Sequence, residues 1–151
     1  MGLPTVKRTF FQRLLGIPAT PRPADVACWT YVAGKVTVSL ERAPELAGPR
    51  GALRLEGAEL PERVLVFRDE AGIPHAVQNR CSHVGRRLDP VPGCELVQCC
   101  SLGKSTYRYD GVSVSGPGGH GIRALAVTES DGRLTIDLGL SPEELAAGGQ
   151  P

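Results

Sequence analysis

Turn sequences that recur at short intervals are the feature that most constrains the fold of this chain. Asp110-Gly111 and Asp131-Gly132 each separate two short segments with the residue types of β-strands, and residues 69–72 separate a third pair. Asp-Gly between two such segments favours a tight β-hairpin, because glycine adopts positive φ without a steric penalty. With 19 glycines and 13 prolines, the composition also favours a loop-rich β protein over a helical bundle. We therefore predict an all-β fold, an antiparallel β sandwich or barrel.

A length of 151 residues fits one compact domain with additions at both ends. We expect a basic N-terminal extension over residues 1–23, the domain over residues 24–140 and a short C-terminal tail over residues 141–151. The extension is expected to contain a short helix that Gly16 ends, and the tail begins like a capped helix at Ser141. Strands are expected at residues 35–40, 51–55, 63–67, 75–77, 105–109, 112–115, 125–128 and 134–138.

Charge and hydropathy exclude two classes of function. The formal net charge is +1, from 17 basic and 16 acidic residues, so no nucleic-acid ligand is expected. No apolar run approaches the roughly 20 residues of a transmembrane helix. Lys7-Arg8 precedes an apolar segment that Arg13, Gly16 and Pro18 interrupt, which does not resemble an export signal, so we expect a cytoplasmic protein.

The cysteines point to metal or redox chemistry. Four of the five lie within residues 81–100, close to His83, and the fifth, Cys28, is expected to be a core thiol. In a chain without a recognised secretory signal, such clustering indicates a metal or redox site before it indicates a disulfide framework. Two loops hold nearly all of the candidate ligands: loop one, residues 81–88 (CSHVGRRL), and loop two, residues 99–107 (CCSLGKSTY).

These two loops resemble the ligand loops of the Rieske iron-sulfur family, C-x-H-x-G-x-x-L and C-x-x-H-G. Loop one matches at every fixed position, through Cys81, His83, Gly85 and Leu88. The resemblance implies a Rieske-like fold with a cluster-binding subdomain of two loops. It also implies a 2Fe-2S cluster in which two Cys hold one iron and two His the other.

Loop two lacks the second histidine. With Cys100 as the ligand, the family's later serine, tyrosine and glycine-proline fall on Ser105, Tyr107 and Gly116-Pro117, while Gly103 takes the histidine position. With Cys99 as the ligand, Leu102 takes that position and one residue must be inserted before the tyrosine. The resemblance implies that Ser105 and Tyr107 donate hydrogen bonds to cluster sulfurs. It further implies that the segment at Pro117 covers the cluster.

Several groups are candidates for the fourth ligand, besides Cys81, His83 and Cys100. Cys99 offers a strong thiolate ligand, although a kink is needed because neighbouring strand residues point to opposite faces. His120 follows a flexible glycine-rich segment, and Cys94 lies between the loops. Water or a side chain of a partner protein is a further option. A cluster with three Cys and one His carries one more negative charge than a standard Rieske cluster.

The resemblance implies an electron-transfer protein that serves a redox partner, a reductase or an oxygenase-type enzyme. We expect a non-catalytic, ferredoxin-like component, because no general base, nucleophile or substrate cleft is recognised. Arg86-Arg87 beside loop one is interpreted as a solvated basic pair or as a docking patch for an acidic partner. The alternative is a Rieske-like scaffold without the cluster, empty or with zinc bound, that acts as a binding or assembly module.

Overall fold

A computed structural model describes residues 5–57 and 59–148 of the chain. Its strands are β1 (Trp29–Val32), β2 (Lys35–Ser39), β3 (Ala52–Leu55), β4 (Val64–Arg68), β5 (Pro74–Gln78), β6 (Leu88–Pro90), β7 (Leu96–Cys99), β8 (Thr106–Arg108), β9 (Ser113–Ser115), β10 (Ala124–Ser130) and β11 (Arg133–Asp137). Its helices are α1 (Phe10–Leu15) and α2 (Pro142–Gly148), with 3-10 turns η1 (Val26–Cys28), η2 (Leu40–Arg42) and η3 (Pro44–Leu46).

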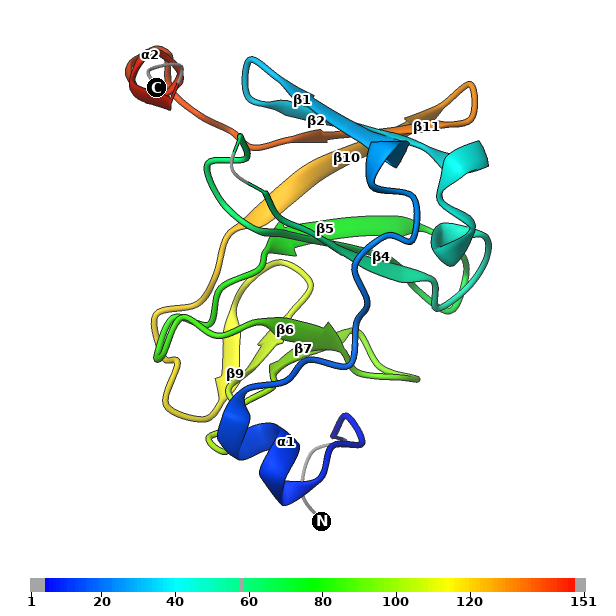
Figure 1. Cartoon of the computed structure of the whole chain (residues 1–151). Helices are drawn as coiled ribbons and strands as arrows, with labels where there is room; N and C mark the ends of the chain where they lie inside the picture. Colours follow the sequence, from blue (N-terminus) through cyan, green and yellow to red (C-terminus); the bar gives the residue numbers. More distant parts are fainter. Residues whose placement is uncertain (1–4, 58, 149–151) are drawn as a thin grey trace.

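Seven strands form one antiparallel sheet in the order β1-β2-β11-β10-β5-β4-β3. The sheet curls, so that β1, β2 and β11 lie across from β4 and β5 (Figure 1). β10 connects the two halves: Ala124 and Leu125 pair with β5, and residues 126–130 pair with β11. The curled sheet encloses the main hydrophobic core, to which β2 and β11 contribute Val36, Val38, Leu134 and Ile136.

β4 is buried on both faces, which explains its unbroken apolar sequence. Val64 and Val66 point into the main core, whereas Leu65 and Phe67 point into a second core on the other side. This second core lies between the large sheet and the smaller one, so β4 joins the two parts of the molecule. Its buried members are Leu65, Phe67, Val77, Cys81, Leu88, Val97, Cys99 and Tyr107.

The small sheet is inserted in the sequence between β5 and β10 and has the strand order β6-β7-β8-β9. Loop one connects β5 to β6, and loop two connects β7 to β8. Leu88 pairs with Cys99 in the β6–β7 ladder, so the end of loop one lies beside the start of loop two. The topology therefore brings the two candidate ligand loops together at one end of the hairpin.

The N-terminal segment lies along the small sheet before the chain reaches β1 (Figure 1). A capping box of Thr9 and Gln12 starts α1, and Gly16 ends it at φ +67°, in the left-handed region that favours glycine. Further along, the buried carboxylate of Asp89 accepts hydrogen bonds of 2.8 Å from the backbone N–H groups of Ala19 and Thr20. The segment is therefore fixed to β6 at a second point.

The predicted fold class is confirmed, since the chain is almost entirely β with a curled antiparallel sheet. Hairpins occur at all three predicted turns, and both predicted short helices are present. β6 was not predicted, because its three residues include Asp89 and Pro90 and show no alternation. Residues 1–4 of the expected extension and 149–151 of the expected tail lie outside the described residues. Within the described ranges, no helix has the length and hydropathy to cross a bilayer.

Candidate metal centre

Loop one is a tight turn closed by its own backbone. The N–H of Cys81 donates to the carbonyl of Arg86 at 2.8 Å, and the N–H of Gly85 donates to the carbonyl of Cys81 at 2.9 Å. Gly85 has φ +72°, a conformation that a residue with a Cβ adopts only with strain. Arg63 holds the loop from outside through hydrogen bonds to the carbonyls of Gly85 and Asn79. The glycine of the motif is therefore required by the shape of the loop.

Loop two leaves β7 at Cys99 and returns at Ser105. The N–H of Cys99 donates to the carbonyl of Ser105 at 2.7 Å, and the N–H of Lys104 donates to the carbonyl of Ser101 at 3.2 Å. Cys100 donates its N–H to the carbonyl of Arg87, near the end of loop one, at 3.0 Å. Backbone hydrogen bonds thus hold the two loops side by side.

Three thiols meet between the loops. Cys81, Cys99 and Cys100 are each at most 1% exposed. Interaction with Cys99, reinforced by burial, raises the pKa of Cys81 to about 12. Interaction with Cys100 raises the pKa of Cys99, whereas interaction with Cys99 lowers the pKa of Cys100. The three thiols therefore lie close enough to influence one another's ionisation.

Two hydroxyl groups approach these sulfurs. The hydroxyl of Tyr107 lies 3.3 Å from Cys81 Sγ and 3.0 Å from Ser82 Oγ, and it accepts a bond of 3.2 Å from the Ser82 N–H. Ser101 Oγ lies 3.0 Å from Cys99 Sγ. Tyr107 thus contacts a cysteine sulfur, whereas Ser105 Oγ accepts a bond of 2.9 Å from the Gly118 N–H.

The glycine-rich segment over residues 116–118 packs on loop two and on Tyr107. A Cβ on Gly118 would lie 1.9 Å from the Tyr107 hydroxyl oxygen, and one on Gly116 would lie 2.6 Å from the Ser105 Cα. Pro117 lies over Gly103, where a Cβ would come within 3.1 Å of its Cγ atom. Only residues without a side chain fit at positions 116 and 118, which explains why the segment is glycine-rich.

Comparison with known proteins identifies the fold. No family model and no curated protein matches the chain. Among solved structures, the ferredoxin of carbazole 1,9a-dioxygenase from Nocardioides aromaticivorans IC177 superposes with a TM-score of 0.51 at 18% identity, over 59% of this chain and 86% of the ferredoxin. This chain has a Rieske-type fold.

Two further solved structures are similar to the chain. The apo form of the quaternary ammonium Rieske monooxygenase CntA gives a TM-score of 0.49 at 20% identity, over 63% of this chain and 30% of the monooxygenase. The plasma membrane Rieske protein PetC3 from the cyanobacterium Synechocystis PCC 6803 gives 0.48 at 18% identity, over 58% of this chain and 86% of PetC3. The chain therefore spans less than a third of the length of the monooxygenase.

The remaining candidate ligands of the Rieske-type domain lie in different places. His83 is exposed on loop one, and His120 is exposed two residues beyond Gly118. Cys94 lies in the β6–β7 turn, at the opposite end of the hairpin from Cys99, and its carbonyl accepts a hydrogen bond of 2.9 Å from the Tyr109 hydroxyl. The structure thus brings Cys99 to the other two thiols and separates Cys94 from them.

A Rieske-type fold implies a 2Fe-2S cluster, which needs four ligand side chains from the protein. Across residues 5–57 and 59–148, no three His, Cys, Asp or Glu side chains are grouped to hold a single metal ion. A structural zinc ion needs four such donors around one point, whereas a 2Fe-2S cluster distributes its four ligands over two irons. Three buried thiols and one exposed imidazole, Cys81, Cys99, Cys100 and His83, fit the donor chemistry of the cluster.

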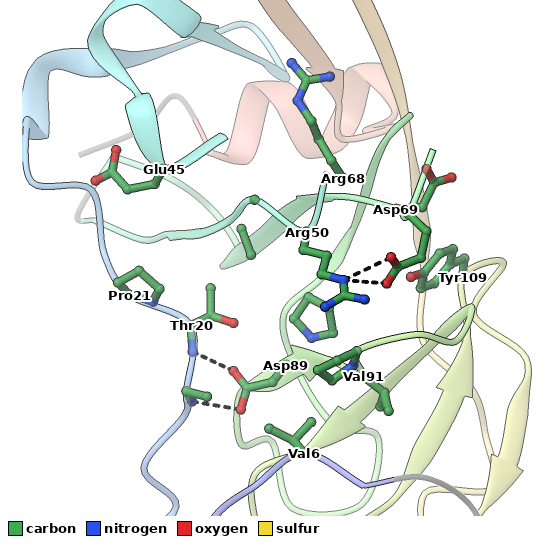
Figure 2. A pocket seen from close by; sticks show the side chains of 16 residues that line it. Val6, Thr20, Pro21, Glu45, Arg50, Arg68, Asp69, Asp89, Val91 and Tyr109 are labelled. Atoms are coloured by element: carbon green, nitrogen blue, oxygen red, sulfur yellow. Dashed lines mark hydrogen bonds and ion pairs between the residues drawn. The ribbon is translucent and has the colours of Figure 1, made fainter. Parts of the chain in front are cut away.

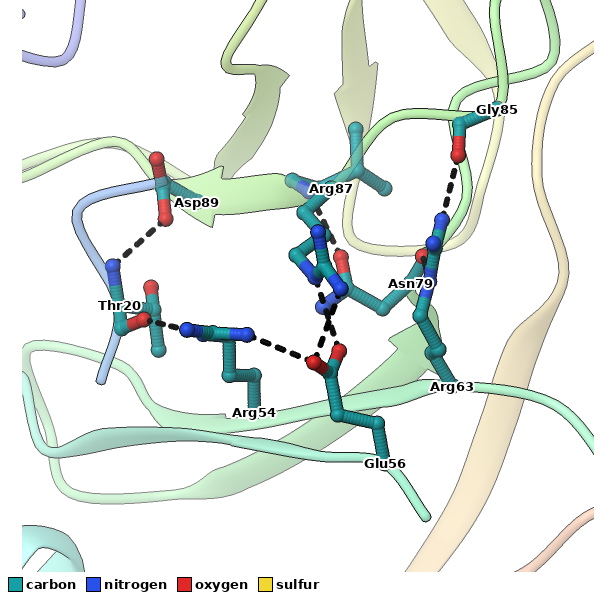
Figure 3. A network of polar contacts seen from close by, with 9 residues as sticks. Thr20, Arg54, Glu56, Arg63, Asn79, Gly85, Arg87 and Asp89 are labelled. Atoms are coloured by element: carbon teal, nitrogen blue, oxygen red, sulfur yellow. Dashed lines mark hydrogen bonds and ion pairs between the residues drawn. The ribbon is translucent and has the colours of Figure 1, made fainter. Parts of the chain in front are cut away.

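A buried polar network borders the loops (Figure 3). Glu56, beyond β3, accepts hydrogen bonds from Arg54 at 2.7 Å and from two nitrogens of Arg87 at 2.9 Å each. Burial opposes ionisation of Glu56, but the bonds from Arg87 and the charges of the neighbouring arginines lower its pKa. The interpretation of Arg86-Arg87 as a solvated pair was wrong, because Arg87 is paired with Glu56 and Arg86 donates to the carbonyls of residues 13 and 14.

Several residues that hold the loops and the N-terminal segment in place were not predicted from the sequence. Arg13 reaches the carbonyl of Cys99, 86 positions away, and Asp89 fixes the N-terminal segment. Asn79 is fully buried: its Oδ1 accepts the Leu88 N–H at 2.6 Å, and its Nδ2 has no partner among the described residues. No local sequence pattern marks these residues, since their partners are brought together only by the fold.

A cleft of about 360 Å³ lies between the N-terminal segment and the small sheet (Figure 2). Thr20, Asp89, Val91 and Tyr109 line it, and both Asp89 oxygens are already bonded to backbone N–H groups. None of the loop thiols lines this cleft. The candidate metal centre is therefore a separate feature, formed by the loops alone.

Proposed function

We propose that this chain is an electron carrier with a 2Fe-2S cluster held by Cys81, His83, Cys100 and an atypical fourth ligand. The observation that carries the proposal is the meeting of three buried thiols between the two loops of a Rieske-type fold. When bound, the cluster supplies reversible one-electron chemistry. The chain itself provides the thiolates, keeps water away from them and places the Tyr107 hydroxyl at the sulfur of Cys81.

We propose Cys99 as the fourth ligand. It adjoins Cys100 in the chain and interacts with the Cys81 thiol, so its sulfur lies near both expected cysteine ligands. The kink that this role needs is supported by the end of β7 at Cys99, where both neighbouring thiols are buried. A third thiolate adds one negative charge, so the reduction potential is expected to lie below that of a two-histidine cluster.

The proposed partner is an oxygenase-type redox protein. The ferredoxin of carbazole dioxygenase, which shares the fold, supplies the analogy. An apolar surface beside the loops also supports a protein partner: Phe10, Phe11 and Leu15 of α1 are 63–71% exposed, and Val84 of loop one and Leu102 of loop two are exposed as well. All five cysteines are free thiols, which suits the reducing cytoplasm.

A second candidate function, a scaffold without the cluster, is favoured by one contact. Cys81 and Cys99 are buried free thiols that interact with each other, so oxidation could join them in a disulfide. In this case the loops would form a thiol switch in a binding or assembly module. Electron transfer by a cluster would then be absent.

The test is chemical analysis of protein purified without oxygen. We expect two irons and two acid-labile sulfides per chain, visible absorption and an EPR signal on reduction. Cys81→Ser and Cys100→Ser are expected to lose the colour, because each removes a thiolate that holds iron. Cys28→Ser, in the main core, is the matched control and is expected to keep it.

Further variants identify the fourth ligand. Cys99→Ser is expected to change the spectrum, whereas Cys94→Ser and His120→Ala leave it unchanged. The reverse pattern would contradict the assignment of Cys99 without affecting the electron-carrier proposal. A colourless wild-type protein after anaerobic reconstitution, with a Cys81–Cys99 disulfide found by mass spectrometry, would favour the scaffold.

A further inference from the structure

Arg13 is a buried cation without a carboxylate partner among the described residues. Its side chain comes from α1 and is 4% exposed. One nitrogen donates to the carbonyls of Cys99 and Ser101 at 3.3 Å each, and the other donates to the Val6 carbonyl at 2.7 Å and to Gln98 Oε1 at 3.1 Å. All four acceptors are neutral. Burial of a charge with only neutral partners costs free energy, so such a charge is expected where an anion is bound.

The nearest permanent carboxylate is occupied elsewhere. Asp89 attracts Arg13 at a distance, but its two oxygens accept the N–H groups of Ala19 and Thr20. The Arg13 guanidinium lies against the backbone of loop two, because it donates to the carbonyls of Cys99 and Ser101. A negative charge held by the thiols of that loop would therefore be close to Arg13.

We propose that Arg13 is a positioning residue and the buried counter-charge of a thiolate-rich centre in loop two. This inference rests on the proposed function. A third thiolate ligand adds one negative charge, and Arg13 places one positive charge behind the backbone of that ligand. Reduction adds an electron and one more negative charge, so the guanidinium stabilises the reduced form more than the oxidised one. The hydrogen bonds to the carbonyls of Cys99 and Ser101 also fix the start of loop two.

The experiment is a redox titration of protein reconstituted with iron and sulfide under anaerobic conditions. Arg13→Met removes the charge and keeps the length, whereas Arg13→Lys keeps the charge and loses the planar fork. Arg42→Met, at an exposed pair with Asp25 on the other side of the molecule, is the control for loss of a charge. Should Arg13→Met fail to fold, Arg13→Gln replaces it, because the amide can keep one bond to a loop carbonyl.

We expect the equilibrium constant for reduction to fall at least tenfold in Arg13→Met, about 59 mV for a one-electron couple. Arg13→Lys is expected to stay within about threefold of wild type, roughly 28 mV, and Arg42→Met to be unchanged. Thermal unfolding of the unloaded proteins measures how much Arg13 contributes to stability, separately from its effect on the reduction potential. If both Arg13 variants lower this stability equally and neither moves the potential, Arg13 is only structural and the inference is overturned.

The same series separates this inference from the proposed function. A wild-type protein that takes up no iron and sulfide overturns both. A wild-type protein that loads normally, with an Arg13→Met variant of unchanged potential, overturns the role of Arg13 alone. A loaded protein in which the potential follows the charge at position 13, and not the side-chain shape, supports it.

Discussion

At the scale of single residues, Tyr107 connects the two loops through one hydroxyl group. It lies on β8 at the end of loop two, yet its hydroxyl contacts the sulfur of Cys81 and the backbone N–H of Ser82 in loop one. Because the ring is fully buried, this hydroxyl has no water to bond with instead. Its hydrogen bonds therefore act directly on the sulfur of Cys81.

Tyr107→Phe is expected to lower the reduction potential by roughly 40 mV, since loss of one hydrogen bond to a sulfur is worth about 1 kcal/mol in a one-electron couple. Stability should fall by a similar amount. Tyr109→Phe is the matched control, because its hydroxyl donates to the carbonyl of Cys94, away from the thiols. Potentiometric titration of both variants checks this, and equal shifts in the two would contradict a specific contact with Cys81.

The sequence predicted the residues of the site better than it predicted their surroundings. Cys81, Cys100 and Tyr107 are marked by fixed spacings within loops, which survive in a local pattern. Arg13 and Asp89 are marked by nothing local, because a long-range hydrogen bond leaves no period or spacing in the chain. The sequence did not reveal the pairing of Arg87 with Glu56 for the same reason, because the two residues lie 31 positions apart.

At the scale of elements, residues 116–118 pack closely on loop two and Tyr107 because Gly116 and Gly118 have no side chain. The backbone of Gly118 lies so close to Tyr107 that a methyl group has no space, whereas nothing lies within 4 Å of a Cβ built on Gly119. Both glycines avoid the left-handed region, so an alanine meets no backbone strain at either. The two positions therefore differ in steric space alone.

Gly118→Ala is expected to cost about 1–3 kcal/mol of folding free energy, the usual range for overpacking. Gly119→Ala should be neutral or slightly stabilising, because alanine restricts the unfolded chain. Urea unfolding of the two variants measures the difference. The iron of a loaded Gly118→Ala protein should also be lost faster to a chelator, since residues 116–118 are displaced; an unchanged rate of loss would show that these residues do not protect the centre.

Elements differed in how well the sequence predicted them. Hairpins with Asp-Gly turns were predicted because the turn chemistry and the flanking residues agree. β6 was missed because Leu88–Pro90 forms a strand only through its ladder with β7, a tertiary effect. β7 ends at Cys99, directly before Cys100, and periodicity alone does not locate that end.

At the scale of the whole molecule, two cores share one strand and one buried ion network. β4 contributes alternate residues to both cores, and Glu56 joins the large sheet, through Arg54 on β3, to Arg87 at the end of loop one. The carboxylate is only 11% exposed. Loss of its charge therefore affects the contact between the large sheet and the loops.

Glu56→Gln is expected to lower the free energy of unfolding by roughly 2 kcal/mol near neutral pH, the range for hydrogen bonds to a charged group. The pKa of Glu56 is lowered in the folded state, so its stabilisation is present above the unfolded value of about 4.3 and is lost as pH falls through the folded pKa. Urea titrations from neutral to acidic pH should show the two proteins converging in that window.

Glu70→Gln is the control for this pH dependence. Glu70 also has a lowered pKa, through its bond from Arg50, but that pair is more than half exposed on both sides. Solvent screens exposed pairs, so they contribute little to stability and little change is expected. A loss in Glu70→Gln as large as in Glu56→Gln would mean that burial of the network is not what matters.

α1 presents two opposite surfaces within six residues. Phe10, Phe11 and Leu15 are exposed to the outside, while Arg13 bonds the carbonyls of Cys99 and Ser101 inside. If the loops hold the proposed cluster, thermodynamic linkage is reciprocal: a molecule that binds the outer surface and shifts α1 would change the reduction equilibrium by a factor, and reduction would change the affinity for that molecule by the same factor. One six-residue helix would thereby couple a docking event on the outer surface to a charge on the loops.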